Sequence, residues 1–196
     1  MFKHPFSGAF WRQAAKSATN LRVMVVCAMC MAASIVLGYF YVPVSDTLTI
    51  RFSYLATATA GLTAGPLGAL LYGFAVDLLD FMIHPQGNFF FGYTLSAMFG
   101  ALFYALFFYR QRVTVLRMVL CRICVNYLVN VGLGAFWSSI LYSKGYLYYL
   151  TKSLLKNTIM LPIEVAIMAV FFSLLLPALK KTGLLPVEQC KKVTWF

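Results

Sequence analysis

The sequence predicts an all-α membrane protein with six transmembrane helices and with the N and C termini in the cytoplasm. Apolar residues occupy 62% of the 196 positions and charged residues 11%, whereas soluble domains have about 45–50% and about 25%. The mean hydropathy is +0.81. The apolar residues form runs of about 20, the length of a helix that crosses a bilayer. We therefore expect a multi-pass protein of the plasma membrane.

Six apolar segments are expected to span the membrane, at residues 22–42, 49–64, 66–83, 90–109, 115–141 and 157–177. The first is too long for the core of a cleavable signal peptide and lacks a cleavage site, so it should remain as a signal-anchor helix. Only Gly65 and Pro66 join the second and third segments, which predicts an antiparallel pair. A basic N-terminal segment (1–21) and a basic tail (178–196) would flank the membrane domain, 22–177.

The distribution of Lys and Arg orients the bundle, because cytoplasmic loops are enriched in these residues. Twelve of the sixteen occur before the first span, in the connection from span four into span five, and in the tail; this group includes Arg110, Arg112, Arg117 and Arg122. The four on the other side are Arg51, Lys144, Lys152 and Lys156. Both termini are then cytoplasmic, and residues 42–50, 83–90 and 141–156 are the outward connections.

The basic character does not indicate a nucleic-acid partner. The net charge is +11, but the cations lie in clusters between apolar runs and form no continuous face. In the N-terminal segment Phe2, Phe6, Phe10 and Trp11 alternate with basic residues. They are compatible with an interfacial helix on anionic lipid or with a disordered tail that carries an aromatic anchor.

Motifs for catalysis or metal binding give no support for an enzyme. Cys27/Cys30 and Cys121/Cys124 form two C-x-x-C pairs, a spacing typical of zinc or redox sites in soluble proteins. Here both lie in apolar spans. A four-thiolate site is geometrically possible, but we interpret the cysteines as small packing residues. The chain has no G-x-x-x-x-G-K-[ST] loop for ATP and no paired nucleophile and base, so we expect no cofactor and no metal.

The third span ends in the polar stretch DLLDFMIHPQG, where Asp77 and Asp80 lie one helical turn apart. A charge inside a span costs roughly 2.5–3.5 kcal/mol. Interfacial placement, pairing with Arg51 and contact with a ligand are all compatible with this cost. His84 then leads an outward loop toward the aromatic run 89–91.

Further polar and aromatic residues gather at the same outer side, around Trp137, Lys144, Lys152, Lys156 and Asn157. Deeper in the membrane, Glu164 needs a partner, and depth favours Asn126 or Asn130. Aromatic walls, amides, carboxylates and a cationic rim would suit a planar heteroaromatic ligand with an anionic tail. Structural polarity that only fixes helix packing is the alternative.

Four stretches give the chain a family resemblance: RFSYL (51–55), AGPLGALLYGFAVDLLDFMIHPQGNFFFGYTLSA (64–97), NVGLGAFWSSILYSKG (130–145) and LLKNTIMLPIEV (154–165). With Ala28 and Ala32 in the first span, they resemble the substrate-binding S components of energy-coupling factor (ECF) vitamin transporters, most closely the folate type. The resemblance implies six helices, a vitamin site near the outer face, and assembly with a transmembrane coupling protein and two cytoplasmic ATPases. Ala28 and Ala32 would contact the coupling protein.

Carried over to this chain, the resemblance predicts a receptor for folate. The ring would lie among Phe81, Phe90, Phe91 and Trp137, with Asp77, Asp80, His84 or Asn157 at its polar edge. Arg51, Lys144, Lys152 and Lys156 would face the glutamyl carboxylates. Two departures concern the vitamin: Gly134 stands where folate-type members often have asparagine, and Ser153 where arginine is common. Alternatives are an S component for thiamine or pantothenate, and a structural or accessory membrane protein.

Overall fold

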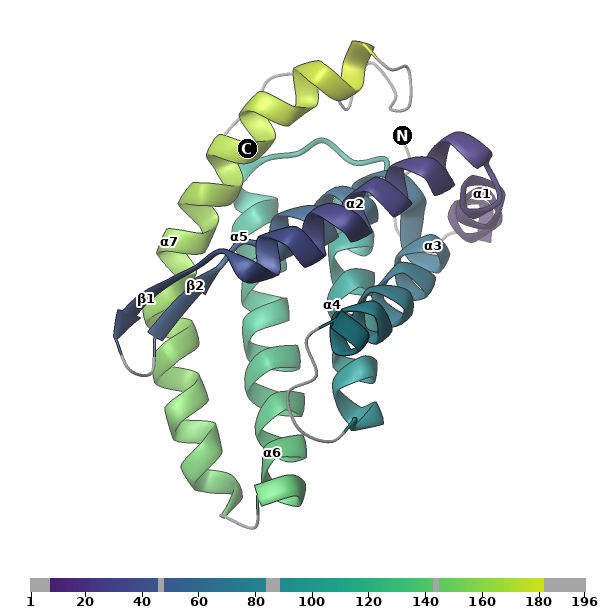
Figure 1. Cartoon of the computed structure of the whole chain (residues 1–196). Coiled ribbons are helices and arrows are strands. Elements are labelled where there is room, and N and C mark those ends of the chain that lie inside the picture. The colour runs from purple at the N-terminus through teal and green to yellow at the C-terminus, as the bar shows by residue number, and fades with distance from the viewer. Residues whose placement is uncertain (1–7, 46–47, 84–88, 143–144, 182–196) are drawn as a thin grey trace.

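The computed structural model is a bundle of long helices with one short β-hairpin (Figure 1). It describes residues 8–45, 48–83, 89–142 and 145–181. The elements are α1 (Gly8–Ala18), α2 (Leu21–Tyr39), β1 (Tyr41–Ser45), β2 (Leu48–Arg51), α3 (Ser53–Ile83), α4 (Phe91–Phe108), α5 (Val115–Cys124), the π-helix η1 (Val125–Leu133), α6 (Gly134–Tyr142) and α7 (Tyr146–Lys181). In the described part of the chain, five helical segments are long and apolar enough to cross a membrane: Leu21–Tyr39, Ser53–Ile83, Phe91–Phe108, Val115–Leu141 and Tyr146–Lys181. The all-α membrane class is therefore confirmed.

The N-terminal segment contains a helix that packs on the bundle. Ala14 of α1 is fully buried beside Tyr109, and the Ser17 and Tyr109 hydroxyl groups lie 2.7 Å apart. Asn20 then caps α2, because its side chain accepts a hydrogen bond from the backbone N–H of Arg22 at 3.0 Å. Of the two alternatives for this segment, residues 8–18 adopt the helix; its contact with lipid stays a prediction.

A β-hairpin follows α2 and shortens two of the predicted spans. The first helix ends at Tyr39, not at residue 42, and the next begins at Ser53, not at residue 49. Between them β1 and β2 pair antiparallel, with Tyr41 opposite Arg51. The stretches YVPVS and LTIR are rich in β-branched residues, which favour strands, so high hydropathy alone extended the predicted helices too far.

The long helix α3 consists of two helical segments joined at Gly65. This residue has φ 75° and ψ 178°, a conformation that glycine adopts readily and other residues avoid, and Pro66 follows without an N–H to donate. The Tyr72 hydroxyl lies beside the side chain of Thr57, on the other side of the break. The two segments thus fold back toward each other, as the Gly-Pro connection predicts.

Close backbone contact joins α3 to α4. A Cβ atom on Gly61 would lie 2.9 Å from the Ala105 backbone nitrogen, and one on Gly73 would lie 2.8 Å from the Ala97 carbonyl oxygen. Small residues allow such approach where lipid offers no hydrophobic driving force between helices. Larger side chains fill the core between α3, α4, α5 and α7.

The last described connection before α7 is shorter than the sequence predicted. Residues 141–156 were expected to form an outward loop, but α7 begins at Tyr146. No glycine or proline interrupts residues 146–156, so the helix continues through Lys152 and Lys156 in spite of their charge. These lysines consequently occupy fixed positions on α7 rather than on a loop.

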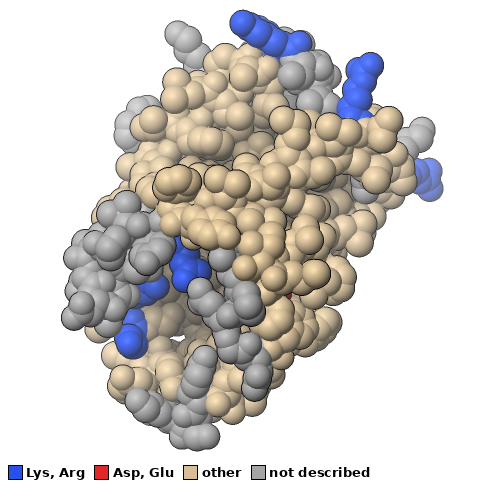
Figure 2. Space-filling model, in the orientation of Figure 1, with Lys and Arg blue, Asp and Glu red and all other residues tan. Residues whose placement is uncertain are grey.

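One face of the molecule is hollowed, and Figure 2 shows Lys and Arg atoms at the edge of this hollow. Lys156 is half-buried and lies close enough to Arg51 and Lys152 to interact with both electrostatically. The end of β2 and the first turns of α7 therefore bring three of the predicted outer cations together. Lys144, the fourth, and His84 lie outside the described residues.

Candidate functional site

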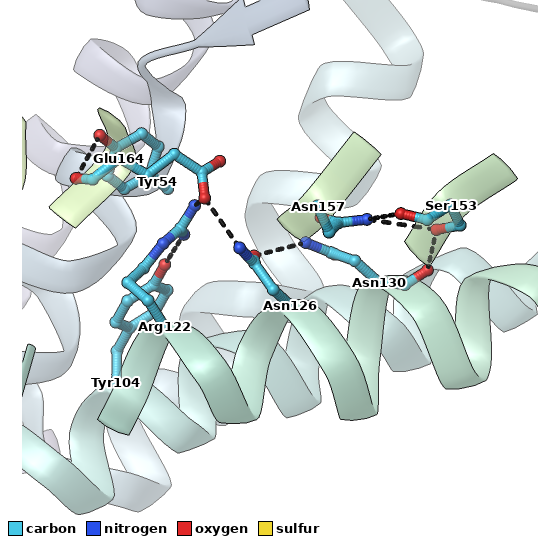
Figure 3. A network of polar contacts seen from close by, with 8 residues as sticks. All are labelled: Tyr54, Tyr104, Arg122, Asn126, Asn130, Ser153, Asn157 and Glu164. Atoms are coloured by element: carbon cyan, nitrogen blue, oxygen red, sulfur yellow. Dashed lines mark hydrogen bonds and ion pairs between the residues drawn. The ribbon is translucent and has the colours of Figure 1, made fainter. Parts of the chain in front are cut away.

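A buried ion pair between Arg122 of α5 and Glu164 of α7 forms the deep end of a polar network (Figure 3). The Arg122 side chain is 3% exposed and that of Glu164 is 14% exposed. Arg122 also donates a hydrogen bond to the Tyr104 hydroxyl, and its Cζ lies 4.2 Å from the centroid of the Tyr54 ring. Buried charges require such compensation. The set joins α3, α4, α5 and α7.

The position of Arg122 corrects the orientation argument in one detail. Its place in the sequence predicts that Arg122 belongs to the cytoplasmic basic cluster, but the structure buries it inside a span. A count of charges along the chain cannot distinguish a loop cation from one whose carboxylate partner comes from a distant helix. The remaining cytoplasmic assignments do not depend on this residue.

Two asparagines extend the network along η1. The Asn126 Nδ2 donates to Glu164 Oε2 at 2.8 Å, and the Asn130 Nδ2 donates to Asn126 Oδ1 at 3.2 Å. The prediction that Asn126 or Asn130 accompanies Glu164 is thus confirmed for Asn126. Both residues lie in a π-helix, a conformation found frequently at functional sites.

On α7 the network ends at Ser153 and Asn157. The Asn157 Nδ2 donates to the Ser153 carbonyl oxygen at 2.8 Å and lies 3.2 Å from Ser153 Oγ. Ser153 Oγ donates to the backbone carbonyl oxygen of Asn130 at 3.3 Å. Asn157 is buried at 9% exposure. Hydrogen bonds therefore lead from the deep ion pair to the part of α7 that carries Lys152 and Lys156 (Figure 3).

Aromatic residues form a second part of the site, where α4 begins beside α6. The Phe90 ring centroid lies 5.6 Å from that of Trp137 and 5.8 Å from that of Tyr93, and Phe136 lies 5.0 Å from Trp137. The Trp137 indole N–H donates to Ser96 Oγ at 3.1 Å. These contacts fix the indole edge and leave an aromatic wall between two helices.

Gly92 permits this arrangement of rings. A Cβ atom at residue 92 would lie 2.3 Å from Phe90 Cε1 and 2.6 Å from Trp137 Cδ2, so any side chain would displace one of them. Phe91, also predicted to line the site, is 54% exposed, whereas Phe90 is half-buried. Of the two phenylalanines, Phe90 is the one packed against Trp137.

The two aspartates of α3 have different neighbours. Asp77 is half-buried and accepts a hydrogen bond from Thr94 Oγ1 at 2.7 Å, so its partner is a hydroxyl group of α4. Asp80 is exposed, and its Oδ1 lies 3.7 Å from the place of a Cβ on Gly38, which brings it near α2. Phe81 packs edge-on against Phe89 at 5.1 Å between centroids.

The cysteines lie in separate apolar clusters, with Cys30 beside α3 and α4 and Cys121 in the core of the bundle. Among the described residues, no three His, Cys, Asp or Glu side chains are grouped so that they could hold a metal ion. The four-thiolate alternative is thus wrong. Ala28 and Ala32 are both exposed, one turn apart on α2.

With this geometry in view, the protein can be compared with known families. A family model described as the ECF transporter, substrate-specific component, matches residues 22–175. The chain belongs to this family. It is an S component, a membrane-embedded transporter subunit and not an enzyme, as the sequence resemblance predicted.

Two curated relatives of this S component are folate transporters. It is 34% identical over 145 residues to the folate transporter FolT of Clostridium novyi (strain NT), covering 74% of this chain and 84% of the relative. It is 30% identical over 154 residues to the folate transporter FolT of Leuconostoc mesenteroides subsp. mesenteroides, covering 76% and 83%. A crystal structure of FolT bound with folic acid shares the fold, with a TM-score of 0.68 and 24% identity over 76% of this chain and 91% of that one.

Several residues of the site in this S component were not predicted from the sequence. Thr94 and Ser96 had no role, although they hold Asp77 and Trp137. Arg122 was misassigned, although a signal for it was present: with Asn126 and Asn130 it repeats at intervals of four residues. Residues at this spacing share a helix face, so the three polar side chains marked one stripe inside an apolar span.

Proposed function

We propose that this S component binds folate from the outer side of the membrane and delivers it for ATP-driven uptake through a coupling protein and two cytoplasmic ATPases. The observation that carries the proposal is the 34% identity with a folate transporter over 84% of that relative's length. The partners follow from membership of the family.

The chemistry of the site supports folate as the ligand. The wall around Phe90 and Trp137 offers aromatic faces for a pterin ring. Amide groups of the network can pair with the polar ring edge. Lys152, Lys156 and Arg51 supply positive charge for the glutamyl carboxylates. A site that combines aromatic and amide groups with clustered cations matches a planar heterocycle that carries an anionic tail.

Six spans with cytoplasmic termini are part of the proposal. If the two segments of α3 each cross the membrane, the five long helical segments make six crossings, and an even number returns the chain to its starting side. In Figure 1 the connection between α4 and α5, the end of α7 and α1 lie toward one end of the molecule, and the end of α6 and the beginning of α7 lie at the other. Basic residues favour the cytoplasm for the first end. Labelling of single added cysteines with a membrane-impermeant reagent tests this orientation.

A binding assay with purified protein tests the ligand. A scavenging receptor should bind folate with a dissociation constant in the nanomolar range, about −12 kcal/mol. Thermal stabilisation by a panel of folate, thiamine and pantothenate separates the candidate vitamins, because ligand at 100 to 1,000 times its Kd stabilises by about 3–4 kcal/mol. Micromolar or weaker folate binding together with a strong response to another vitamin would reject folate as the substrate. A response to none, with no capture of a coupling protein, would favour an accessory role.

A further inference from the structure

The polar network carries a direction that begins at its ion pair. Glu164 forms an ion pair with the Arg122 guanidinium, and the carboxylate of an ion pair only accepts hydrogen bonds. Asn126 must therefore turn its amide nitrogen toward Glu164, which is the bond that the structure contains at 2.8 Å. Its carbonyl oxygen then points away from the ion pair. The orientation of this amide, which atom positions alone leave ambiguous, is fixed by charge.

The same reasoning determines the orientation of Asn130. The Asn126 Oδ1 can only accept, so the Asn130 side chain meets it with its Nδ2, at 3.2 Å. One N–H of the Asn130 amide is therefore committed to Asn126, and the side-chain carbonyl oxygen faces away from that bond. On η1 the network consequently presents an acceptor oxygen, with the second N–H of the same amide beside it.

Asn130 also lies where a ligand could reach it. Asn126 is fully buried, but Asn130 is exposed. Its backbone carbonyl oxygen accepts from Ser153, one turn of α7 from Lys156 and Asn157. An amide inside a spanning segment is costly in contact with lipid and usually faces the bundle interior or a hydrated cavity. These positions point Asn130 toward the space between η1 and the cationic part of α7.

We infer that Asn130 is a specificity-determining residue: its side-chain carbonyl oxygen accepts a hydrogen bond from an N–H group of the ligand ring, and the Arg122–Glu164 pair, acting through Asn126, positions that oxygen. The inference rests on the proposed function. For folate the donors are the 2-amino group and N3–H of the pterin. A ring that presents an acceptor at this edge would leave the Asn130 oxygen unpaired and would be rejected.

Ligand analogues test the acceptor role in the full-length purified protein. Folate, 2-desamino-2-methylfolate and 4-amino-4-deoxyfolate are titrated against wild type and Asn130→Ala. The second compound lacks the 2-amino donor, and the third has an acceptor nitrogen in place of N3–H. Asn130→Ala should weaken folate binding roughly ten- to a hundred-fold, because a buried donor loses its partner. One of the two analogues lacks the N–H group that Asn130 accepts in folate. For that analogue, the affinities of wild type and Asn130→Ala should agree within about twofold.

Two results would overturn the inference: equal loss of affinity for all three compounds, or folate binding unaffected by Asn130→Ala. Failure of the proposed function looks different, because wild type would then bind none of the three tightly. If Asn130→Ala does not fold, Asn130→Ser gives the same comparison, since serine has no side-chain carbonyl oxygen and its hydroxyl group is shorter than the amide.

The positioning role of the network has its own test. Asn126→Ala leaves Asn130 in place but allows the Asn130 side-chain amide to rotate by 180°, which exchanges its oxygen and nitrogen. The ratio of the affinities for folate and for the analogue that lacks the accepted N–H group should then be at least about fivefold smaller than in wild type. Thr158→Val is the matched control, because Thr158 joins α7 to η1 through Tyr127 at 2.9 Å outside the network; it should retain full discrimination. Undiminished discrimination in Asn126→Ala would refute the positioning role.

Discussion

Glu164→Gln isolates the contribution of the buried charge on α7. Glutamine has nearly the same volume as glutamate and keeps an oxygen that can accept from Asn126, so the substitution removes the charge with little change of shape. Arg122, whose side chain is 3% exposed, would then be a buried cation without its anion. Breaking a buried pair in this way costs about 3–5 kcal/mol of the free energy of unfolding.

The contacts that Arg122 keeps place the expected cost at the lower end of this range. The Tyr104 hydroxyl still accepts its hydrogen bond, worth about 1.5–3 kcal/mol to a charged donor. The Tyr54 ring still lies 4.2 Å from its Cζ, and a desolvated cation–π contact contributes up to about 2 kcal/mol. We therefore expect a loss of about 3 kcal/mol for Glu164→Gln. The double variant Arg122→Gln/Glu164→Gln has no buried charge and should lie within about 1 kcal/mol of wild type.

Reversible unfolding in mixed detergent micelles, followed by circular dichroism, measures these free energies. Lys152→Gln is the matched control, because Lys152 is an exposed cation near the half-buried Lys156, and the loss of its charge relieves repulsion. It should not lower the stability of the ligand-free protein. The reasoning fails if Glu164→Gln is within about 1 kcal/mol of wild type, or if the double variant is less stable than the single one.

Four further substitutions probe ligand binding and assembly. Gly92→Ala should lower folate affinity at least about tenfold in calorimetry, since its Cβ would lie 2.3 Å from the Phe90 ring. Lys156→Gln should weaken binding of folate about tenfold but weaken binding of pteroate less, because pteroate lacks the glutamyl carboxylates and keeps only its benzoate carboxylate. Ala28→Trp and Ala32→Trp should abolish folate uptake by cells that express the coupling protein and ATPases, and yet preserve folate binding to the purified protein, because both positions are exposed.

Each of these predictions has a control and a contrary outcome. A Cβ on Gly100 meets nothing within 4 Å, so Gly100→Ala should bind folate normally; equal effects at both glycines would contradict the steric argument. A Lys156→Gln variant that binds folate and pteroate with equal losses would remove Lys156 from tail recognition. Met29 is 67% exposed on α2, and if Met29→Trp blocks uptake as strongly as Ala28→Trp, the docking role of the alanines is not specific.

Features decided by local chemistry were predictable from the sequence. Gly65 and Pro66 marked the break in α3 because only glycine readily adopts the required φ and proline cannot continue the hydrogen bonding. The depth of Glu164 in an apolar span demanded a partner, and Asn126 at matching depth proved to be one. Contacts between side chains of different helices, which depend on how each helix is rotated about its axis, were harder to predict. Asp77 was weighed as a partner of Arg51, but it accepts a hydrogen bond from Thr94, which hydropathy does not distinguish from its neighbours.

Element boundaries failed where hydropathy and backbone preference disagree. Residues 41–45 and 48–51 are apolar enough to prolong a helix, yet they form two paired strands. Residues 146–156 are polar enough to suggest a loop, yet they are helical. Backbone conformation followed residue type and not average hydropathy in both cases. β-Branched residues favoured strands in the first segment, and the lack of glycine and proline allowed a helix in the second.

The π-helix changes the direction in which the side chains that follow it in the span point. Asn126 meets Glu164 on α7, whereas Trp137, eleven residues later, meets Ser96 on α4. In an uninterrupted α-helix, eleven residues make about three turns, and both side chains would emerge on the same side. The wider turns of η1 offset the two, so a single span contributes the amides to one wall and the indole to another. Straightening η1 into an α-helix would therefore bring both side chains to one face of the span, so that the amides and the indole could not both keep their partners on α7 and α4.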